Sequence, residues 1–127
     1  MKLLRHILLC GCSAVLCGCG NPGSAVANAP ASAQNDLETT VLIDVRSAEE
    51  YASGHLRGAV NIPHDRIADE IGSVAADKSA RIILYCRSGR RADTALNTLK
   101  AIGYENVSNY GGLEDAQMRL NLTVVSD

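Results

Sequence analysis

Apolar residues occur along the chain in short continuous runs rather than in strict alternation with polar residues. The clearest runs are residues 39–46 and 81–85, which are rich in Val, Ile and Leu, and shorter ones occupy residues 60–62 and 106–110. Continuous apolar runs of this length are typical of parallel strands that are covered on both faces. We therefore predict four strands at these positions. For residues 121–127 the pattern leaves both a strand and an irregular tail open.

Helical signals lie between these runs. Ser47 and Glu50 have the spacing of a capping box, which predicts a short helix that Gly54 ends. Further helices are predicted over residues 64–71 and 113–118. Another is indicated by an apolar stripe at helical spacing, which consists of Ala92, Ala95, Leu96, Leu99 and Ile102. Because strands alternate with helices through short connections, the sequence predicts an α/β fold with a mainly parallel sheet and helices on both faces.

The first twenty residues carry a different pattern. Two basic residues precede an apolar stretch over residues 7–16, which is too short to span a bilayer, since a spanning helix needs ~20 residues. The length is typical of a signal peptide. The segment ends in Leu16-Cys17-Gly18-Cys19, which resembles a bacterial lipobox. We predict a lipoprotein-type signal peptide over residues 1–18 and lipidation of Cys19.

Two alternatives to this interpretation stay open, an ordinary cleaved signal and an uncleaved anchor. A metal or disulfide cluster of the four early cysteines is disfavoured because they lie inside a hydrophobic segment. Residues 19–35 comprise the lipidated cysteine and an uncharged Ala-, Ser-, Asn- and Pro-rich stretch, which predicts a flexible linker. The folded domain is then residues 36–127. We expect it on the periplasmic or cell-envelope side of a bacterial membrane, held there by the lipid.

The whole chain of 127 residues is long enough for one domain, and its net charge of −2 gives no general attraction for nucleic acid. It contains no Phe or Trp, so aliphatic residues must build the core. Of the five cysteines, only Cys86 lies outside the first twenty residues. After cleavage and lipidation it would be the one free thiol in an oxidising compartment, which marks it as reactive.

The segment after Cys86 combines features that bind anions. The residues that follow the thiol, up to the start of a predicted helix, are Arg87, Ser88, Gly89, Arg90 and Arg91. Gly89 permits a tight loop whose N–H groups point inward, and the helix N-terminus and the arginines add positive charge. These features favour the thiolate and predict an anion-binding loop around a nucleophile. The alternative is a buried, inert cysteine with a solvated arginine face.

Other candidate residues lie at the ends of the first strand and helix. Asp44 and Arg46 close the first predicted strand at the same sheet edge as Cys86. Asp44 is either satisfied by hydrogen bonds in the fold or poised for chemistry. His55 is either a general base or a structural residue that hydrogen-bonds to backbone. The residue types alone favour the structural interpretation in both cases.

Three motifs in order resemble the rhodanese family of sulfurtransferases. They are Cys86-x-x-Gly89-x-Arg91, the block from Leu42 to Pro63 with Gly54-His55-Leu56-x-Gly58-Ala59, and the closing segment Gly103-Tyr104 with Gly111-Gly112-Leu113. The resemblance covers residues 39–116 and is greatest to exported single-domain members of the phage shock protein E type. It implies a three-layer α/β/α fold with a four- to five-stranded sheet.

The resemblance also implies an activity. Cys86 would take a sulfane sulfur from thiosulfate or a similar donor as a persulfide and pass it to cyanide or a thiol. Residues 87–91 would bind the substrate, while Asp44, Arg46 and Glu50 would form a buried polar network that supports the loop. No metal or other cofactor is implied, and we expect a monomer. Family members often carry an aromatic residue after Gly112, whereas this chain continues with residues 114–118, Glu-Asp-Ala-Gln-Met, which predicts a more open pocket.

Two other functions would also use a cysteine in such a loop. Cysteine-loop phosphatases and arsenate reductases place an arginine after five intervening residues, where this chain has Ala92, and Arg91 comes one residue early. The shorter loop favours sulfur over phosphate. A sulfur carrier without turnover, or a thiol redox sensor that acts with a protein partner, would use the same cysteine and stays open.

Overall fold

The computed structural model describes residues 39–127, and the predicted signal peptide, Cys19 and linker lie outside the described residues. Four strands form one sheet in the order β3-β1-β4-β5, and every neighbouring pair is parallel. The strands are β1 (Thr40–Asp44), β3 (Val60–Asn61), β4 (Arg81–Cys86) and β5 (Val107–Gly112). The predicted parallel α/β fold is therefore confirmed.

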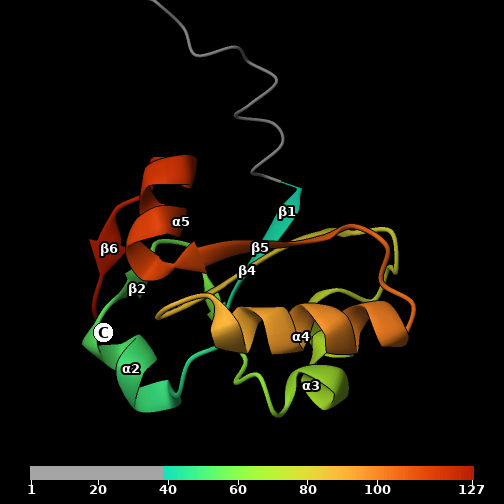
Figure 1. Ribbon diagram of the computed structural model, residues 1–127. Coiled ribbons are helices and arrows are strands. Elements are labelled where there is room, and N and C mark those ends of the chain that lie inside the picture. The colour runs from blue at the N-terminus through green and yellow to red at the C-terminus, as the bar shows by residue number, and fades with distance from the viewer. Residues whose placement is uncertain (1–38) are drawn as a thin grey trace, which may run out of the picture.

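Helices cover both faces of this sheet (Figure 1). One face carries α3 (Ile67–Val74) and α4 (Arg90–Ala101), and α5 (Leu113–Leu120) lies on the other. Along β4 the side chains alternate between two buried clusters, with Leu84 facing α4 and Tyr85 facing α5. Burial on both faces explains why the strand sequence is continuously apolar.

The short helix α2 (Ala48–Ser53) begins as the sequence predicts. The Ser47 side chain accepts from the Glu50 N–H, and the Glu50 carboxylate accepts from the Ser47 N–H, which completes the capping box. Gly54 ends the helix. This local order fixes the position of Glu50 relative to the carboxyl end of β1.

Three details differ from the prediction. The second helix begins at Ile67 rather than at residue 64, because residues 64–66 form a turn. Ile102 is 39% exposed, so the buried stripe of α4 ends at Leu99. A small antiparallel pair, β2 (His55–Leu56) with β6 (Val124–Val125), brings the C-terminal residues against the segment after α2 and settles the ambiguity there in favour of a strand.

Candidate active site

The carboxyl ends of three parallel strands meet at one edge of the sheet. Asp44 ends β1, Cys86 ends β4 and Gly112 ends β5. Cys86 is the register partner of Gly112, after an irregularity in the β4–β5 pairing. The fold thus brings the thiol, the first polar motif and the glycine pair to the same edge, where ligands bind in open α/β sheets.

A tight loop after Cys86 holds the sulfur. Gly89 has φ of 89°, a left-handed conformation that favours glycine, and its N–H donates to Cys86 Sγ at 2.9 Å. The helix α4 begins at the next residue, so its first N–H groups, which have no partner within a helix, lie close to the thiol. The Gly89 N–H points at the sulfur, and the N-terminus of α4 lies next to it in the chain. Both stabilise negative charge on Cys86 or on an atom bound to it.

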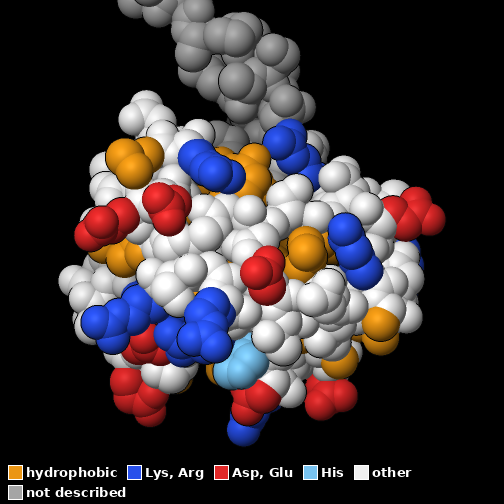
Figure 2. Space-filling model, in the orientation of Figure 1, with side chains coloured by type: hydrophobic (Ala, Val, Ile, Leu, Met, Phe, Trp, Pro, Cys, Tyr) orange, Lys and Arg blue, Asp and Glu red, His pale blue; other side chains and the backbone are white. Residues whose placement is uncertain are grey.

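The cationic side chains of the loop differ in their surroundings. Arg87 and Arg90 are exposed, as is Ser88, and Figure 2 shows Lys or Arg side chains grouped over the start of α4. A hollow of about 410 Å³ is lined by Ser88, Arg90, Arg91 and Thr94. Two guanidinium groups and two hydroxyl groups suit this hollow to a small anion.

Arg91 is engaged in an ion pair with Glu50. Its Nη1 and Nη2 donate to the two carboxylate oxygens at 2.7 and 2.9 Å, and each side chain is 31% exposed. Hydrogen bonding from Arg91 lowers the pKa of Glu50 to about 2. The pair links α2 to the first turn of α4, directly after the cysteine loop. Part of the hydrogen-bonding capacity of Arg91 is therefore already used inside the protein.

Asp44 and Arg46 form a second pair, which is buried. Arg46 Nε and Nη2 donate to the Asp44 carboxylate at 2.6 to 3.0 Å, and Nη2 also donates to the Gly54 carbonyl oxygen at 2.6 Å. The hydrogen bonds to Asp44 raise the pKa of Arg46. Asn61 Nδ2 donates to both backbone carbonyl oxygens, those of Asp44 and Arg46. This arrangement anchors both ends of the segment that carries Glu50.

His55 is part of the fold beside the site. It is 5% exposed, its ring stacks on Tyr51 at 3.7 Å between centroids, and its Nδ1 lies 3.0 Å from the Tyr51 carbonyl oxygen. These contacts agree with the structural interpretation of His55 rather than with a general base.

The sequence did not single out Asn109, yet it connects three parts of the site. Its Nδ2 donates to the Gly89 carbonyl oxygen at 2.9 Å and to Asp93 Oδ1 at 2.7 Å. Its Oδ1 accepts from the Gly111 N–H at 2.8 Å. A polar residue in a short strand carries no signal of this role, because the role depends on how β5 lies against the start of α4.

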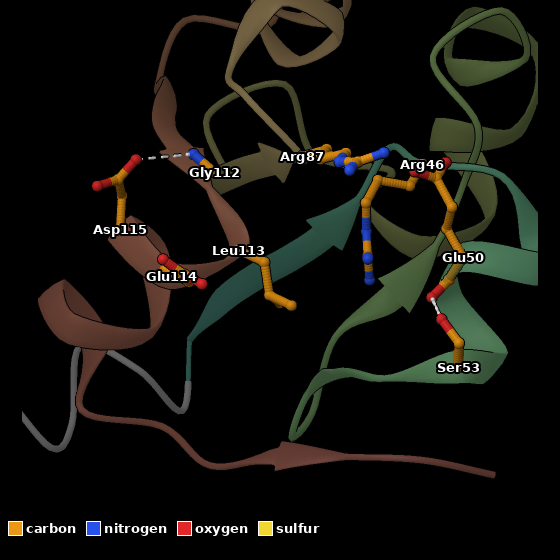
Figure 3. A pocket seen from close by; sticks show the side chains of 8 residues that line it. All are labelled: Arg46, Glu50, Ser53, Arg87, Gly112, Leu113, Glu114 and Asp115. Carbon is orange, nitrogen blue, oxygen red and sulfur yellow. Dashed lines mark hydrogen bonds between the residues drawn. The ribbon is translucent and has the colours of Figure 1, made fainter.

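A cleft of about 500 Å³ lies beside the loop. Figure 3 shows Arg46, Glu50 and Arg87 on one side and Leu113 and Glu114 on the α5 side; the full lining is Arg46, Glu50, Ser53, Arg87, Gly112, Leu113, Glu114 and Asp115. Cys86 itself is 1% exposed. A molecule in this cleft would therefore contact the side chains around the thiol rather than the sulfur itself.

Neither a metal-binding cluster nor a membrane-spanning helix is present in the described part of the chain. Within residues 39–127, no group of three or more His, Cys, Asp or Glu side chains is placed to hold a metal ion. Over the same residues, no helix has the length and apolar character that a membrane crossing requires.

Comparison with known proteins identifies relatives of this chain. The family model described as rhodanese-like domain matches residues 17–118. Thiosulfate sulfurtransferase PspE of Escherichia coli is 40% identical over 76 residues, which cover 60% of this chain and 73% of that protein. Thiosulfate:glutathione sulfurtransferase of Saccharomyces cerevisiae is 32% identical over 83 residues, 57% of this chain and 60% of that protein. A structure described as rhodanese with anions, from E. coli, has a TM-score of 0.64 at 34% identity and covers 69% of this chain and 99% of its own.

Proposed function

The chain belongs to the rhodanese-like domain family, and on that premise we propose that it is a thiosulfate sulfurtransferase. Family membership and the sulfurtransferases among the relatives support sulfur transfer in general. The observation that carries the proposal is the hydrogen bond from the Gly89 N–H to Cys86 Sγ at 2.9 Å, inside a loop that ends at the start of α4. That geometry suits a thiolate and, after reaction, a persulfide.

The reaction has two half-reactions. The Cys86 thiolate attacks the sulfane sulfur of thiosulfate, the S–S bond of the donor breaks, and its electron pair leaves with sulfite, so that Cys86 carries a persulfide. Cyanide or a thiolate then attacks the outer sulfur, the Cys86 S–S bond breaks, and its electron pair returns to Sγ. Because the first product leaves before the acceptor reacts, ping-pong kinetics should follow.

The surrounding residues take distinct roles in this proposal. Residues 87–91, that is Arg87, Ser88, Gly89, Arg90 and Arg91, bind the substrate through backbone N–H groups and cationic side chains. Asp44, Arg46 and Glu50 support the loop without contact to the reacting atoms. Two contacts support these roles. The Asp44–Arg46 pair is buried, and the Glu50–Arg91 pair joins α2 to α4.

The test follows thiocyanate formation from thiosulfate and cyanide by the mature domain. We expect steady turnover that disappears in Cys86→Ala, and mass spectrometry should show one added sulfur atom on Cys86 after incubation with thiosulfate alone. Ser73→Ala, a substitution on the exposed surface of α3, is the control and should keep full activity. Turnover that persists in Cys86→Ala would refute the proposal.

A second candidate is a sulfur carrier or thiol redox module that acts with a protein partner. The observation that favours it is the 1% exposure of Cys86, which a docking partner could open. The same experiment separates the two functions. One stoichiometric sulfur on Cys86 without steady thiocyanate production would support the carrier, and repeated turnover with small molecules would support the enzyme.

We further propose that the protein is held at the bacterial cell envelope by a lipid on Cys19, after removal of residues 1–18. The support is the lipobox-like sequence that ends at Cys19. The Cys19→Ser variant should be recovered in the soluble fraction of the periplasm, whereas the natural chain should sediment with membranes. A variant that stays bound to membranes would refute lipidation.

A further inference from the structure

The cleft beside the cysteine loop has two charged side chains without partners. Most of its ionic groups are engaged: Arg46 pairs with Asp44, Glu50 with Arg91, and Asp115 accepts from the Gly112 N–H at 3.1 Å. Within residues 39–127, the side chains of Arg87 and Glu114 form neither an ion pair nor a hydrogen bond. These two groups are therefore free to meet a ligand.

Glu114 adds negative charge to the α5 side of the cleft. It lies in the first turn of α5, where the helix N-terminus would otherwise attract an anion. The Asp115 carboxylate caps that N-terminus and Glu114 adds a second negative charge. The wall therefore repels anions and attracts cations. The hollow lined by Ser88, Arg90, Arg91 and Thr94 has the opposite preference, so the surfaces that flank the loop differ in sign.

The pairing of β4 with β5 also brings Glu114 near the cysteine loop. Cys86 is the register partner of Gly112, and a Cβ atom on Gly112 would lie 2.7 Å from the Arg87 carbonyl oxygen. Glu114 follows Gly112 by two residues, and Leu113 between them adds an apolar side chain to the cleft (Figure 3). A molecule in this cleft thus lies beside the residues that border Cys86, with a cation and an anion available to it.

On the basis of the proposed sulfurtransferase function, we propose that this cleft takes the acceptor, a small thiol that carries an ammonium group, and that Glu114 selects it. The ammonium group pairs with Glu114, and the carbon chain lies on Leu113. If the acceptor also has a carboxylate, Arg87 is its partner. The acceptor thiolate attacks the outer sulfur of the Cys86 persulfide, and the pair of the broken S–S bond returns to Sγ. The acceptor leaves with the transferred sulfur as its own persulfide.

The experiment isolates the second half-reaction. Protein that carries sulfur on Cys86 is separated from thiosulfate and mixed with one of three thiols of similar length. Cysteamine is cationic, mercaptoethanol is neutral and mercaptopropionate is anionic. The rate of sulfur loss from Cys86 is followed by mass spectrometry. The intrinsic reactivity of each thiol is the same for both proteins. For each thiol, the ratio of the transfer rate in the natural protein to that in Glu114→Gln therefore measures the effect of Glu114 alone.

We expect Glu114→Gln to slow transfer to cysteamine by about threefold and to speed transfer to mercaptopropionate by a similar factor, as for an exposed ion pair. Transfer to mercaptoethanol should not change, and added salt should shrink both effects. Glu105→Gln, in the exposed segment before β5, is the matched control and should leave all three rates unchanged.

The outcomes separate this inference from the function on which it rests. If thiosulfate leaves no sulfur on Cys86, or no acceptor removes it, the sulfurtransferase proposal fails. If transfer proceeds and the three ratios are the same in Glu114→Gln as in the natural protein, the function stands and the role of Glu114 is refuted. The same holds if Glu105→Gln shifts the ratios equally, because the effect would then be one of net charge.

Discussion

The backbone of Gly112 passes so close to Arg87 that a Cβ atom on Gly112 would lie 2.7 Å from the Arg87 carbonyl oxygen. Real Cβ atoms do not approach backbone oxygens so closely, so any side chain at this position must displace the chain. The contact joins the end of β5 to the first residue after the nucleophile. The glycine is thus required by the path of the cysteine loop.

The first prediction concerns Gly112→Ala. The new methyl group should push Arg87 away, shift Gly89 relative to Cys86 Sγ and slow persulfide formation by about tenfold or more, since small displacements in a reacting site have large kinetic effects. The loss of stability should be modest, about 1–2 kcal/mol, as for overpacking elsewhere. Single-turnover sulfur loading and urea unfolding measure the two effects separately.

Gly72→Ala is the matched control for this change. Gly72 lies inside α3, and a Cβ there would meet no atom within 4 Å. Alanine should stabilise the protein by about 0.5–1 kcal/mol through helix propensity and leave sulfur loading unchanged. Equal sulfur loading in Gly112→Ala and the natural protein would show that the close approach does not constrain the loop.

The second prediction concerns Asn109 as a positioning residue. In Asn109→Asp the donor to Gly89 and Asp93 is replaced by a carboxylate that faces two acceptors. The new carboxylate has no hydrogen-bond donor opposite it on this side, so Gly89 should shift. We expect sulfur loading at saturating thiosulfate to slow by about tenfold. The double variant Asn109→Asp with Asp93→Asn restores a donor opposite the carboxylate and should recover part of the rate. Recovery of stability without recovery of rate would indicate a purely structural role.

Much of the fold was accessible from the sequence because its signals are local. The continuous apolar run of β4 reflects burial on both faces, and the capping box of Ser47 and Glu50 depends on four consecutive residues. The sequence predicts the start of α3 too early, because residues 64–66 have ordinary helical composition but form a turn. The C-terminal strand β6 depends on its pairing with β2, which no local pattern encodes.

The site was accessible in part for the same reason. The loop from Cys86 to Arg91 is one continuous segment, and its composition indicates anion binding. The contact of Arg91 with Glu50 joins residues 41 positions apart, and the contacts of Asn109 with Gly89 join residues 20 apart. Such contacts are set by the packing of α2, α4 and β5, so the residue types alone could not reveal them.

The third prediction concerns acid stability. The pKa of Glu50 falls from its ordinary 4.5 to about 2 in the folded protein because Arg91 donates hydrogen bonds to the carboxylate. A group with a lowered folded pKa contributes stability that is fully present above pH 4.5 and is lost as the pH falls toward 2. Since both side chains are 31% exposed, solvent screening reduces the contribution to about 1 kcal/mol.

Urea unfolding at a series of pH values between 5 and 2 measures this effect. The free energy of unfolding should fall less steeply with acidification in Glu50→Gln than in the natural protein, because the variant has no proton to take up at this position. Glu105→Gln, which changes an exposed acid before β5, should follow the natural protein. Parallel curves for Glu50→Gln and the natural protein would contradict the assignment.

The last prediction separates donor binding from loop support among the arginines. Arg90 is exposed in the hollow beside the loop, so Arg90→Ala should raise the apparent KM for thiosulfate by about fivefold and leave the rate at saturation unchanged. In the proposed function, Arg91→Ala removes a contact with thiosulfate, and it also removes the ion pair with Glu50. It should therefore raise KM more than it slows single-turnover persulfide formation at saturating thiosulfate, while still slowing that step measurably.

Glu50→Gln isolates the second effect, because it weakens the pair and keeps the Arg91 guanidinium group. It should reproduce the slower saturated rate of Arg91→Ala without the rise in KM. Arg57→Ala is the control, since Arg57 contacts Thr123 on the β2–β6 side and should change neither constant. Identical kinetics for Arg91→Ala and Glu50→Gln would mean that Arg91 acts only through Glu50, and it would then be removed from the donor site.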